Sequence, residues 1–270
     1  MIKVINPKLK IGKRFHYAHL ICDCLFLEIN NNVHEYDKVY RIKNIYQTLG
    51  NFDKIYNEVM KTTNIELPIK EFNSLHISTI KPLRKVNYSD IYNIHYFRNY
   101  IFNRYSINYN LYDDSFPKIL LIKRGKSKKL ISDKKLEQKI KTNNITSGKE
   151  RREINNIDLI EKFLKNKFSQ TFNAIYLENL SFEKQVKYFN NSKMIICAHG
   201  AGMSNIFFCK PKTKILEVTC GGKFQFFDTI SKKLNLIHSK CHDNNHTQVI
   251  KFINDADKNN KSIIIKKNTK

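Results

Sequence analysis

The second half of the chain alternates short apolar segments with longer amphipathic ones, and this alternation constrains the fold more than any other feature. The segments with strand character are 118–123, 174–178, 193–198, 214–218 and 236–239. The segments with helical spacing of apolar residues are 156–168, 181–192, 202–209 and 224–235. Apolar strands that alternate with helices at this pace predict an α/β fold with a parallel sheet and right-handed crossovers.

The first half shows the same alternation less clearly. Its helical segments are 15–30, 51–63 and 94–107, and its strand-like segments are 36–42 and 74–80. A loop around Pro117, preceded by Asp113-Asp114-Ser115, indicates a boundary. We therefore predict two Rossmann-like domains facing a cleft, at 1–112 and 116–253, of which the C-terminal one is better defined.

Two lysine-rich segments interrupt or follow the second domain. Residues 125–150 are polar and predict a solvated insertion, and residues 254–270 predict a basic flexible tail. Ligands of parallel α/β sheets bind beyond the carboxyl ends of the strands. We therefore expect the functional site at that edge of the sheet.

The charge balance is strongly basic. Lysine and arginine total 48 against 24 aspartates and glutamates, a formal charge of +24. Such a surface suits nucleic acid, anionic lipid or phosphorylated ligands. However, the excess is spread along the chain and is mostly lysine, whose codons are A/T-rich, so base composition explains much of it. The 18 phenylalanines and 14 tyrosines exclude a disordered chain.

The chain shows neither a membrane span nor a secretory signal. Its longest apolar stretch, 16–29, is short and contains Asp23 and Glu28, and the first 15 residues lack an apolar core. Six cysteines in 270 residues do not make a disulfide scaffold. We expect a cytoplasmic location, with peripheral association of the basic surface with a membrane as a further expectation.

The motif with the strongest chemical content is CAHGAGMSN at 197–205, directly after a strand and at the start of a helix. Small residues let the backbone approach a ligand closely, and the exposed N–H groups of a helix start favour an anion such as phosphate. The motif is neither a dinucleotide fingerprint nor a P-loop. The alternative is a tight strand-to-helix turn without a ligand.

The stretch from Leu177 to Glu217 closely resembles glycosyltransferase family 61, which includes capsular polysaccharide enzymes, plant xylosyl- and arabinosyltransferases and protein O-GlcNAc transferases. The positions that match the family pattern in register are Ser181, Glu183, Gln185, His199, Gly200, Ala201, Gly202, Ser204, Asn205, Phe208, Pro211 and Glu217. A match over roughly 45 residues in register is more specific than the HGAG tetrapeptide alone.

Two further patches resemble the family. The strand at 118–123 is followed by Arg124, and RREINN supplies Arg151, Arg152 and Asn155 before the next helix. The family keeps these closer together than this chain does. An alternative register pairs Arg124 with Lys128, Lys129 and Ser132. We prefer the Arg151 register because the helix that follows it is better formed.

The third patch lies near the N-terminus. FHYAHLICDCLF resembles an N-terminal helix of the family and supplies His19 and Asp23, which share one helix face. A carboxylate bonded to one imidazole nitrogen fixes the tautomer and raises the basicity of the other nitrogen. His19 is therefore the expected catalytic base, with Asp23 orienting it. The alternative is a core histidine with a structural role.

The resemblance implies a GT-B architecture and an inverting, metal-independent transferase that uses a nucleotide sugar. Without a metal, arginines and backbone N–H groups must neutralise the leaving diphosphate. Arg124, Arg151 or Arg152 and the 199–202 turn suit that role, with Ser204 and Asn205 beside them. A Mg²⁺-dependent enzyme would offer paired carboxylates, typically as Asp-x-Asp. We expect no metal or other cofactor, because the acidic pair found is Asp113-Asp114, without that spacing and in the predicted linker.

The sequence also predicts roles for four individual residues. Glu217, at the carboxyl end of a strand, is expected to bind the ribose hydroxyls of the donor through both oxygens, and His199 its phosphate or sugar. Gln185 and Ser181 are expected to be a helix-surface residue and a helix cap. The remaining cluster with metal-like content is His238, Cys241, His242 and His246, whose spacing matches no zinc pattern.

The sequence therefore favours a glycosyltransferase that moves a sugar from a UDP-linked donor to a hydroxyl of a glycan or protein, in polysaccharide biosynthesis or glycosylation. Its partners would be the nucleotide sugar and a glycan or glycoprotein acceptor. One alternative is a catalytically degenerate GT-B protein that binds nucleotides or glycans. A second is a basic nucleic-acid-binding protein, but no motif for nucleic acid is evident and we expect no such partner.

Overall fold

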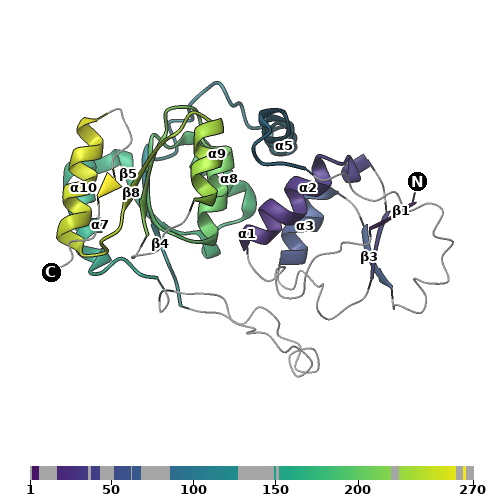
Figure 1. The fold of residues 1–270 in the computed structure, drawn as a ribbon, viewed down its shortest axis with the longest axis horizontal. Coiled ribbons are helices and arrows are strands. Elements are labelled where there is room, and N and C mark those ends of the chain that lie inside the picture. The colour runs from purple at the N-terminus through teal and green to yellow at the C-terminus, as the bar shows by residue number, and fades with distance from the viewer. Residues whose placement is uncertain are drawn as a thin grey trace. The chain divides into compact units, whose positions relative to one another are not determined.

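The computed structural model describes residues 2–5, 17–35, 38–42, 52–61, 63–67, 86–126, 149, 152–219, 225–259 and 264–265. These residues form two compact units, and the first unit gives way to the second after Arg104 (Figure 1). Three predicted features lie outside the described residues: the strand at 74–80, most of the insertion at 125–150, and the site residue Arg151. The facing of two domains across a cleft stays a prediction.

The first unit contains a small parallel sheet in the order β1-β2-β3. Its strands are β1 (Ile2–Ile5), β2 (Lys38–Ile42) and β3 (Thr63–Leu67). The register aligns Val4 with Tyr40 and Tyr40 with Ile65. The strand predicted at 36–42 is confirmed, whereas β1 and β3 were not predicted.

The helices of the first unit pack around aromatic side chains. They are α1 (Tyr17–His19), the π-helix η1 (Leu20–Leu25), α2 (Phe26–Ile29), the 3-10 turn η2 (Val33–Glu35), α3 (Asp53–Met60) and α5 (Ile91–Arg104). Phe26 and Phe97 are buried and meet edge to face, with ring centroids 5.4 Å apart. The buried carboxylate of Glu28 accepts a hydrogen bond from the Tyr56 hydroxyl. These contacts join α2, α3 and α5.

The second unit is built on a six-stranded parallel sheet in the order β5-β4-β6-β7-β8-β9. The strands are β4 (Ile119–Lys123), β5 (Phe172–Tyr176), β6 (Met194–Ala198), β7 (Lys214–Val218), β8 (Ile237–Cys241) and β9 (Ile264–Ile265). The predicted parallel α/β sheet is therefore confirmed. Its first five strands follow the 2-1-3-4-5 order of flavodoxin-like folds.

Helices cover both faces of this sheet (Figure 1). They are α7 (Ile157–Phe168), the 3-10 turns η5 (Ser169–Thr171), η6 (Leu177–Asn179) and η7 (Ala201–Phe208), and the helices α8 (Phe182–Asn191), α9 (Phe226–Lys233) and α10 (His246–Lys258). On the face under α7 and α10, Leu121, Ile196 and Leu216 share one buried cluster with Phe252. Alternate strand residues point to opposite faces, so their neighbours along each strand face α8 and α9.

The end of the chain differs from the sequence prediction. The segment from residue 254, predicted to begin a flexible tail, continues α10 to Lys258 and buries Ala256, and β9 then pairs with β8. Val249 and Phe252 are also buried, so the helix follows an apolar spacing that its many polar residues obscure. Lys214 donates to the carbonyls of Ala256 and Asp257 and so caps the helix end.

None of the helices in the described ranges combines the length and the apolar character that crossing a bilayer requires.

Candidate functional site

The candidate site lies where the sheet order reverses, between β4 and β6. The chain leaves β4 toward β5 on one side and leaves β6 toward β7 on the other. Open α/β sheets bind their ligands beyond the carboxyl ends of the strands at such a switch point. Arg124 directly follows β4, and His199 directly follows β6. The Arg124 guanidinium donates to the His199 carbonyl through Nη2, at 3.2 Å. The fold therefore brings together two residues that are 75 positions apart.

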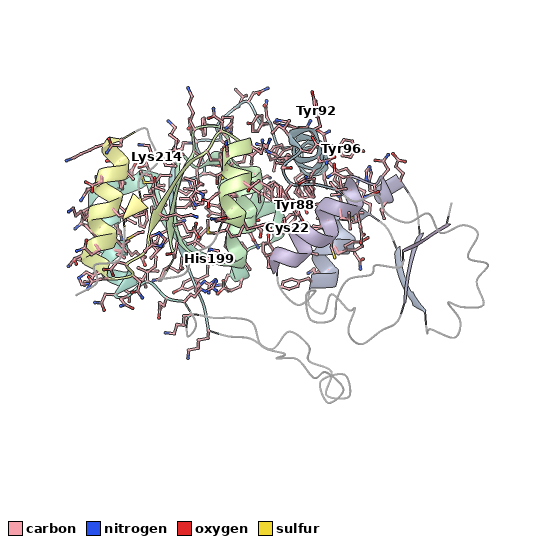
Figure 2. All side chains as sticks on the ribbon, in the orientation of Figure 1. Cys22, Tyr88, Tyr92, Tyr96, His199 and Lys214 are labelled. Atoms are coloured by element: carbon pink, nitrogen blue, oxygen red, sulfur yellow. The ribbon has the colours of Figure 1, made fainter. Side chains whose placement is uncertain are left out.

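Strand register also explains why these side chains share one face. Ile122 pairs with Cys197, and Cys197 pairs with Glu217. Two residues further along, Arg124 and His199 continue on the same face as Glu217. His199 contacts Phe227 of α9, with ring centroids 5.6 Å apart, which places this face under α9. Figure 2 shows His199 at the opposite end of the sheet from Lys214, the first residue of β7.

Close contacts leave no room for a side chain at the two glycines of the HGAG motif. A Cβ at Gly200 would lie 1.6 Å from Arg124 Nη2, and one at Gly202 would lie 2.6 Å from Leu177 Cδ1. The backbone of Gly200 is extended, with a φ of 161°, so any residue could adopt it. Glycine is needed at position 200 because the guanidinium packs directly on the backbone. Gly202, with Ala201, begins η7.

We expect Gly200→Ala to separate function from stability. The new methyl group must displace the end of a flexible arginine side chain, so the melting temperature should change by only a few degrees. The guanidinium should lose its hydrogen bond to the His199 carbonyl. The rate of the sugar transfer expected from the sequence should then fall about tenfold or more. Thermal unfolding and initial rates, measured on the same preparation, test this. A variant with normal rates would show that the position of Arg124 is unimportant.

Glu217 is the centre of a buried polar cluster. Its carboxylate is 1% exposed; Oε1 contacts His199 Nδ1, and Oε2 lies 2.9 Å from His238 Nε2. Burial alone would raise the pKa of Glu217, but hydrogen bonds from His199 and His238, and then their charges, outweigh it and lower the pKa to about 2. The carboxylate is therefore ionised throughout the physiological pH range.

The cluster continues along β8 to α9. His238 Nδ1 lies 3.2 Å from Asp228 Oδ1 on α9, and the other oxygen of Asp228 pairs with Lys240. A chain of polar contacts thus runs from Lys240 through Asp228, His238 and Glu217 to His199. This differs from the expected role of Glu217, because both oxygens that would bind ribose hydroxyls already contact imidazoles. The structure gives the carboxylate the means to orient His199 instead.

A family model described as Glycosyltransferase 61 matches residues 17–216, from α1 to β7. The chain belongs to glycosyltransferase family 61. Family membership indicates a glycosyltransferase, which acts on a nucleotide-sugar donor and a glycan acceptor in general terms. No curated protein matches the chain significantly.

The last residues of the 197–205 motif are buried and hold the candidate site in place. Asn205 is fully buried and donates to Gln185 Oε1 at 3.0 Å, while Gln185 donates to the carbonyls of Leu177 and Leu180. Ser204 is also fully buried. Gln185 is 4% exposed, so the prediction that it lies on a helix surface is wrong. These side chains connect η7 to α8 and fix the turn that carries His199.

The upstream basic patch of the transferase is only partly described. Asn155 donates its backbone N–H to the Asn244 carbonyl at 3.0 Å, and its side chain accepts from the Asn244 amide at 3.3 Å. Asn244 lies after β8, so Asn155 is at the carboxyl edge of the sheet, and its role in binding the donor stays a prediction. Arg152 lies three residues earlier and is partly buried. Arg151 is outside the described residues.

The expected base lies in the first unit. His19 is the last residue of α1, and Asp23 lies four positions later in the π-helical segment η1. π-helical segments within α-helices are frequent at functional sites. The side chains of both residues are outside the described part of the structure, so their pairing stays a prediction.

The acidic and metal-like sequences of the transferase do not converge. Within the described ranges, no three histidine, cysteine or acidic side chains are grouped as metal ligands. The chain does contain an Asp-x-Asp sequence, at 255–257, contrary to the expectation from the sequence, and it lies in the last turn of α10. There, Asp257 pairs with Lys167 at 2.9 Å, and Lys214 from the amino end of β7 caps the helix. The predicted cluster separates too: His242 bonds Thr219, and His246 faces Asn156.

Proposed function

We propose that the chain is an inverting, metal-independent glycosyltransferase with a UDP-linked sugar as donor and a hydroxyl of a glycan or protein as acceptor. The observation that carries this proposal is the contact between Arg124 and the HGAG turn at the switch point of the sheet. Open α/β sheets bind their ligands at such a switch point. The family supplies the reaction class, and the contact between Arg124 and the turn supports a donor site at this edge of the sheet.

The donor diphosphate would bind against Arg124 and the start of η7. The amides of Ala201 and Gly202 belong to the first turn of this helix, where N–H groups lack partners within the helix and favour an anion. Negative charge grows on the diphosphate as the bond to the sugar breaks. A guanidinium held in place before the reaction stabilises that charge without reorganisation. Arg151 or Arg152 would add positive charge near the same edge.

His199 would contact the donor phosphate or sugar through its other ring nitrogen, Nε2. Its Nδ1 faces the ionised Glu217, so the proton on that nitrogen is fixed and the orientation of the ring is set. In this proposal Glu217 and His238 are positioning residues, and Glu217 no longer binds ribose directly. The buried contacts of Glu217 with His238, and of His238 with Asp228, would keep the His199 imidazole in one orientation during the reaction.

Inversion requires one base that takes the proton from the acceptor hydroxyl as its oxygen attacks the anomeric carbon. We assign this role to His19, with Asp23 as the residue that orients it. The bond to the sugar forms at the acceptor oxygen, the bond to the diphosphate breaks, and His19 holds the proton. The GT-B arrangement would bring the first unit to the face of the donor that carries the sugar.

The test is a thermal-shift titration with UDP, GDP and CMP and their common sugar conjugates, with and without EDTA. A ligand that binds only the native state stabilises it by about 2.7 kcal/mol at a hundredfold excess over its Kd, which raises Tm by several degrees. We expect UDP compounds to give this rise and EDTA to leave it unchanged. His19→Ala should keep the full shift and lose sugar transfer.

Other results would contradict parts of the proposal. A shift that EDTA removes would contradict metal independence, and a shift with GDP or CMP alone would contradict the UDP donor. Donor binding without transfer or hydrolysis would favour the degenerate alternative. Absence of a shift with every nucleotide would contradict the donor site itself.

A further inference from the structure

A groove of about 500 Å³ runs along α5 in the first unit. The residues that line it are Asn30, Asn32, Tyr92, Asn93, Tyr96 and Asn99. Four are amides and two are phenols, and none carries a charge. The groove is therefore locally neutral on a chain with a net charge of +24, in which 27% of all residues are charged. The volume lies within the range of small-molecule sites in proteins.

The two tyrosines form an exposed aromatic stripe on the helix. Tyr92, Tyr96 and Asn99 are spaced by four and three residues, so they follow one face of α5 over two turns. Figure 2 shows Tyr92 and Tyr96 on this helix. Tyr92 is 82% exposed and Tyr96 is 43% exposed. Large aromatic side chains presented to solvent beside one another are a feature of binding surfaces. The Tyr96 ring also lies beside the His34 ring, with centroids 6.4 Å apart.

The amide side of the groove is held in place by the fold. Asn32 has a left-handed backbone, with a φ of 55°, and its Oδ1 accepts a hydrogen bond of 2.8 Å from the Tyr96 hydroxyl. Asn30 donates to the Phe26 carbonyl at 2.8 Å. At the other end of the stripe, Tyr88 donates to the Cys22 carbonyl and stacks on Phe26, which fixes the start of α5 (Figure 2). Contacts between described residues of the first unit therefore hold the walls of the groove.

The chemistry of the lining selects an uncharged ligand rich in hydroxyl groups. Tyrosine rings offer apolar faces with a polar tip, which suit the flat C–H faces of a sugar ring. Asparagine amides offer two donors and an acceptor each, which suit its hydroxyls. A phosphorylated or nucleic-acid ligand would select lysine or arginine instead. We propose that this groove is a binding site for a neutral oligosaccharide chain, separate from the donor site.

Such a site would hold a glycan by a part of the chain that does not react. Tethering a substrate through a second contact raises its effective concentration at the reacting centre. The proposal goes beyond the proposed function and does not rest on it, because neutral glycan binding needs neither a donor nor catalysis.

The test uses three neutral tetrasaccharides as probes: one of xylose, one of glucose and one of N-acetylglucosamine. Binding to the full chain is followed by saturation-transfer NMR and by titration calorimetry. We expect at least one to bind, and Tyr92→Ala or Tyr96→Ala to weaken it about tenfold. Tyr92→Phe keeps the ring and should bind within about threefold of the wild type. Tyr112→Ala is the matched control, because Tyr112 is 39% exposed in the second unit and should not change binding.

Two results would overturn the proposal. One is the absence of binding that depends on Tyr92 or Tyr96 with all three neutral probes. The other is tighter binding, at the same tyrosines, of a sulfated heparin tetrasaccharide, which would make the groove a polyanion site. The nucleotide thermal shift of Tyr92→Ala keeps the two proposals distinguishable, since it reports on the donor site alone.

Discussion

Replacing Arg124 by alanine is expected to lower kcat/KM for sugar transfer by about a thousandfold. The guanidinium lies at the switch point of the sheet and packs on the backbone of Gly200, where the leaving diphosphate would sit. Removing one preorganised donor from a site of developing charge costs about 10²–10³ in rate. Loss of ground-state binding to the diphosphate adds to this, so both KM for the donor and kcat should change.

Two further variants sharpen the Arg124 result. Arg124→Lys keeps the charge but loses the planar fork, so it should recover only part of the activity. Lys193→Ala removes one positive charge from an exposed side chain at the amino end of β6, away from the site, and should have normal kinetics. Unchanged affinity for UDP in Arg124→Ala, measured by thermal shift, would contradict the proposed donor site.

The sheet of the second unit could be predicted because buried parallel strands are short apolar runs between polar segments. The strand predicted at 214–218 has the same bounds as β7. The helix predicted at 156–168 begins one residue before α7, and the helix predicted at 181–192 extends one residue beyond α8 at each end. In contrast, β1 and β3 lie in segments with little apolar continuity. Their pairing with β2 depends on contacts between distant parts of the chain, which a local pattern does not reveal.

The candidate site could be predicted only where its residues lie within motifs. Arg124, His199 and Glu217 each follow or end a strand, so the edge they share follows from the parallel sheet. The roles of His238, Asp228 and Lys240 could not be found in this way, because they depend on the register of β8 against β7. The sequence did contain one indication. His238 and Lys240 are two positions apart on β8, so their side chains point to the same face of the sheet, the face that α9 covers. Gln185 was missed because a polar residue within a helix is usually exposed.

The second large effect is expected from Glu217→Gln, which should lower the free energy of unfolding by about 3 kcal/mol at pH 7. The fold lowers the pKa of Glu217 from 4.5 to about 2, and a difference of this size between folded and unfolded chain corresponds to that stabilisation. The amide cannot accept from both imidazoles, so a buried nitrogen loses its partner. His199 also loses the group that orients it, so kcat should fall about 10- to 100-fold.

The pH dependence of this stability difference tests whether the ionised carboxylate of Glu217 causes it. Because the pKa is lower in the folded state, the stabilisation is complete above about pH 4.5 and disappears as pH falls through about 2. The difference in unfolding free energy between wild type and Glu217→Gln should therefore shrink by about half between pH 7 and pH 3, as measured by urea titration. Glu183→Gln is the matched control. Its carboxylate forms only a half-exposed pair with Lys187, which is worth a few tenths of a kcal/mol. A constant difference across this pH range would mean that packing, and not charge, holds His199 and His238 against β7.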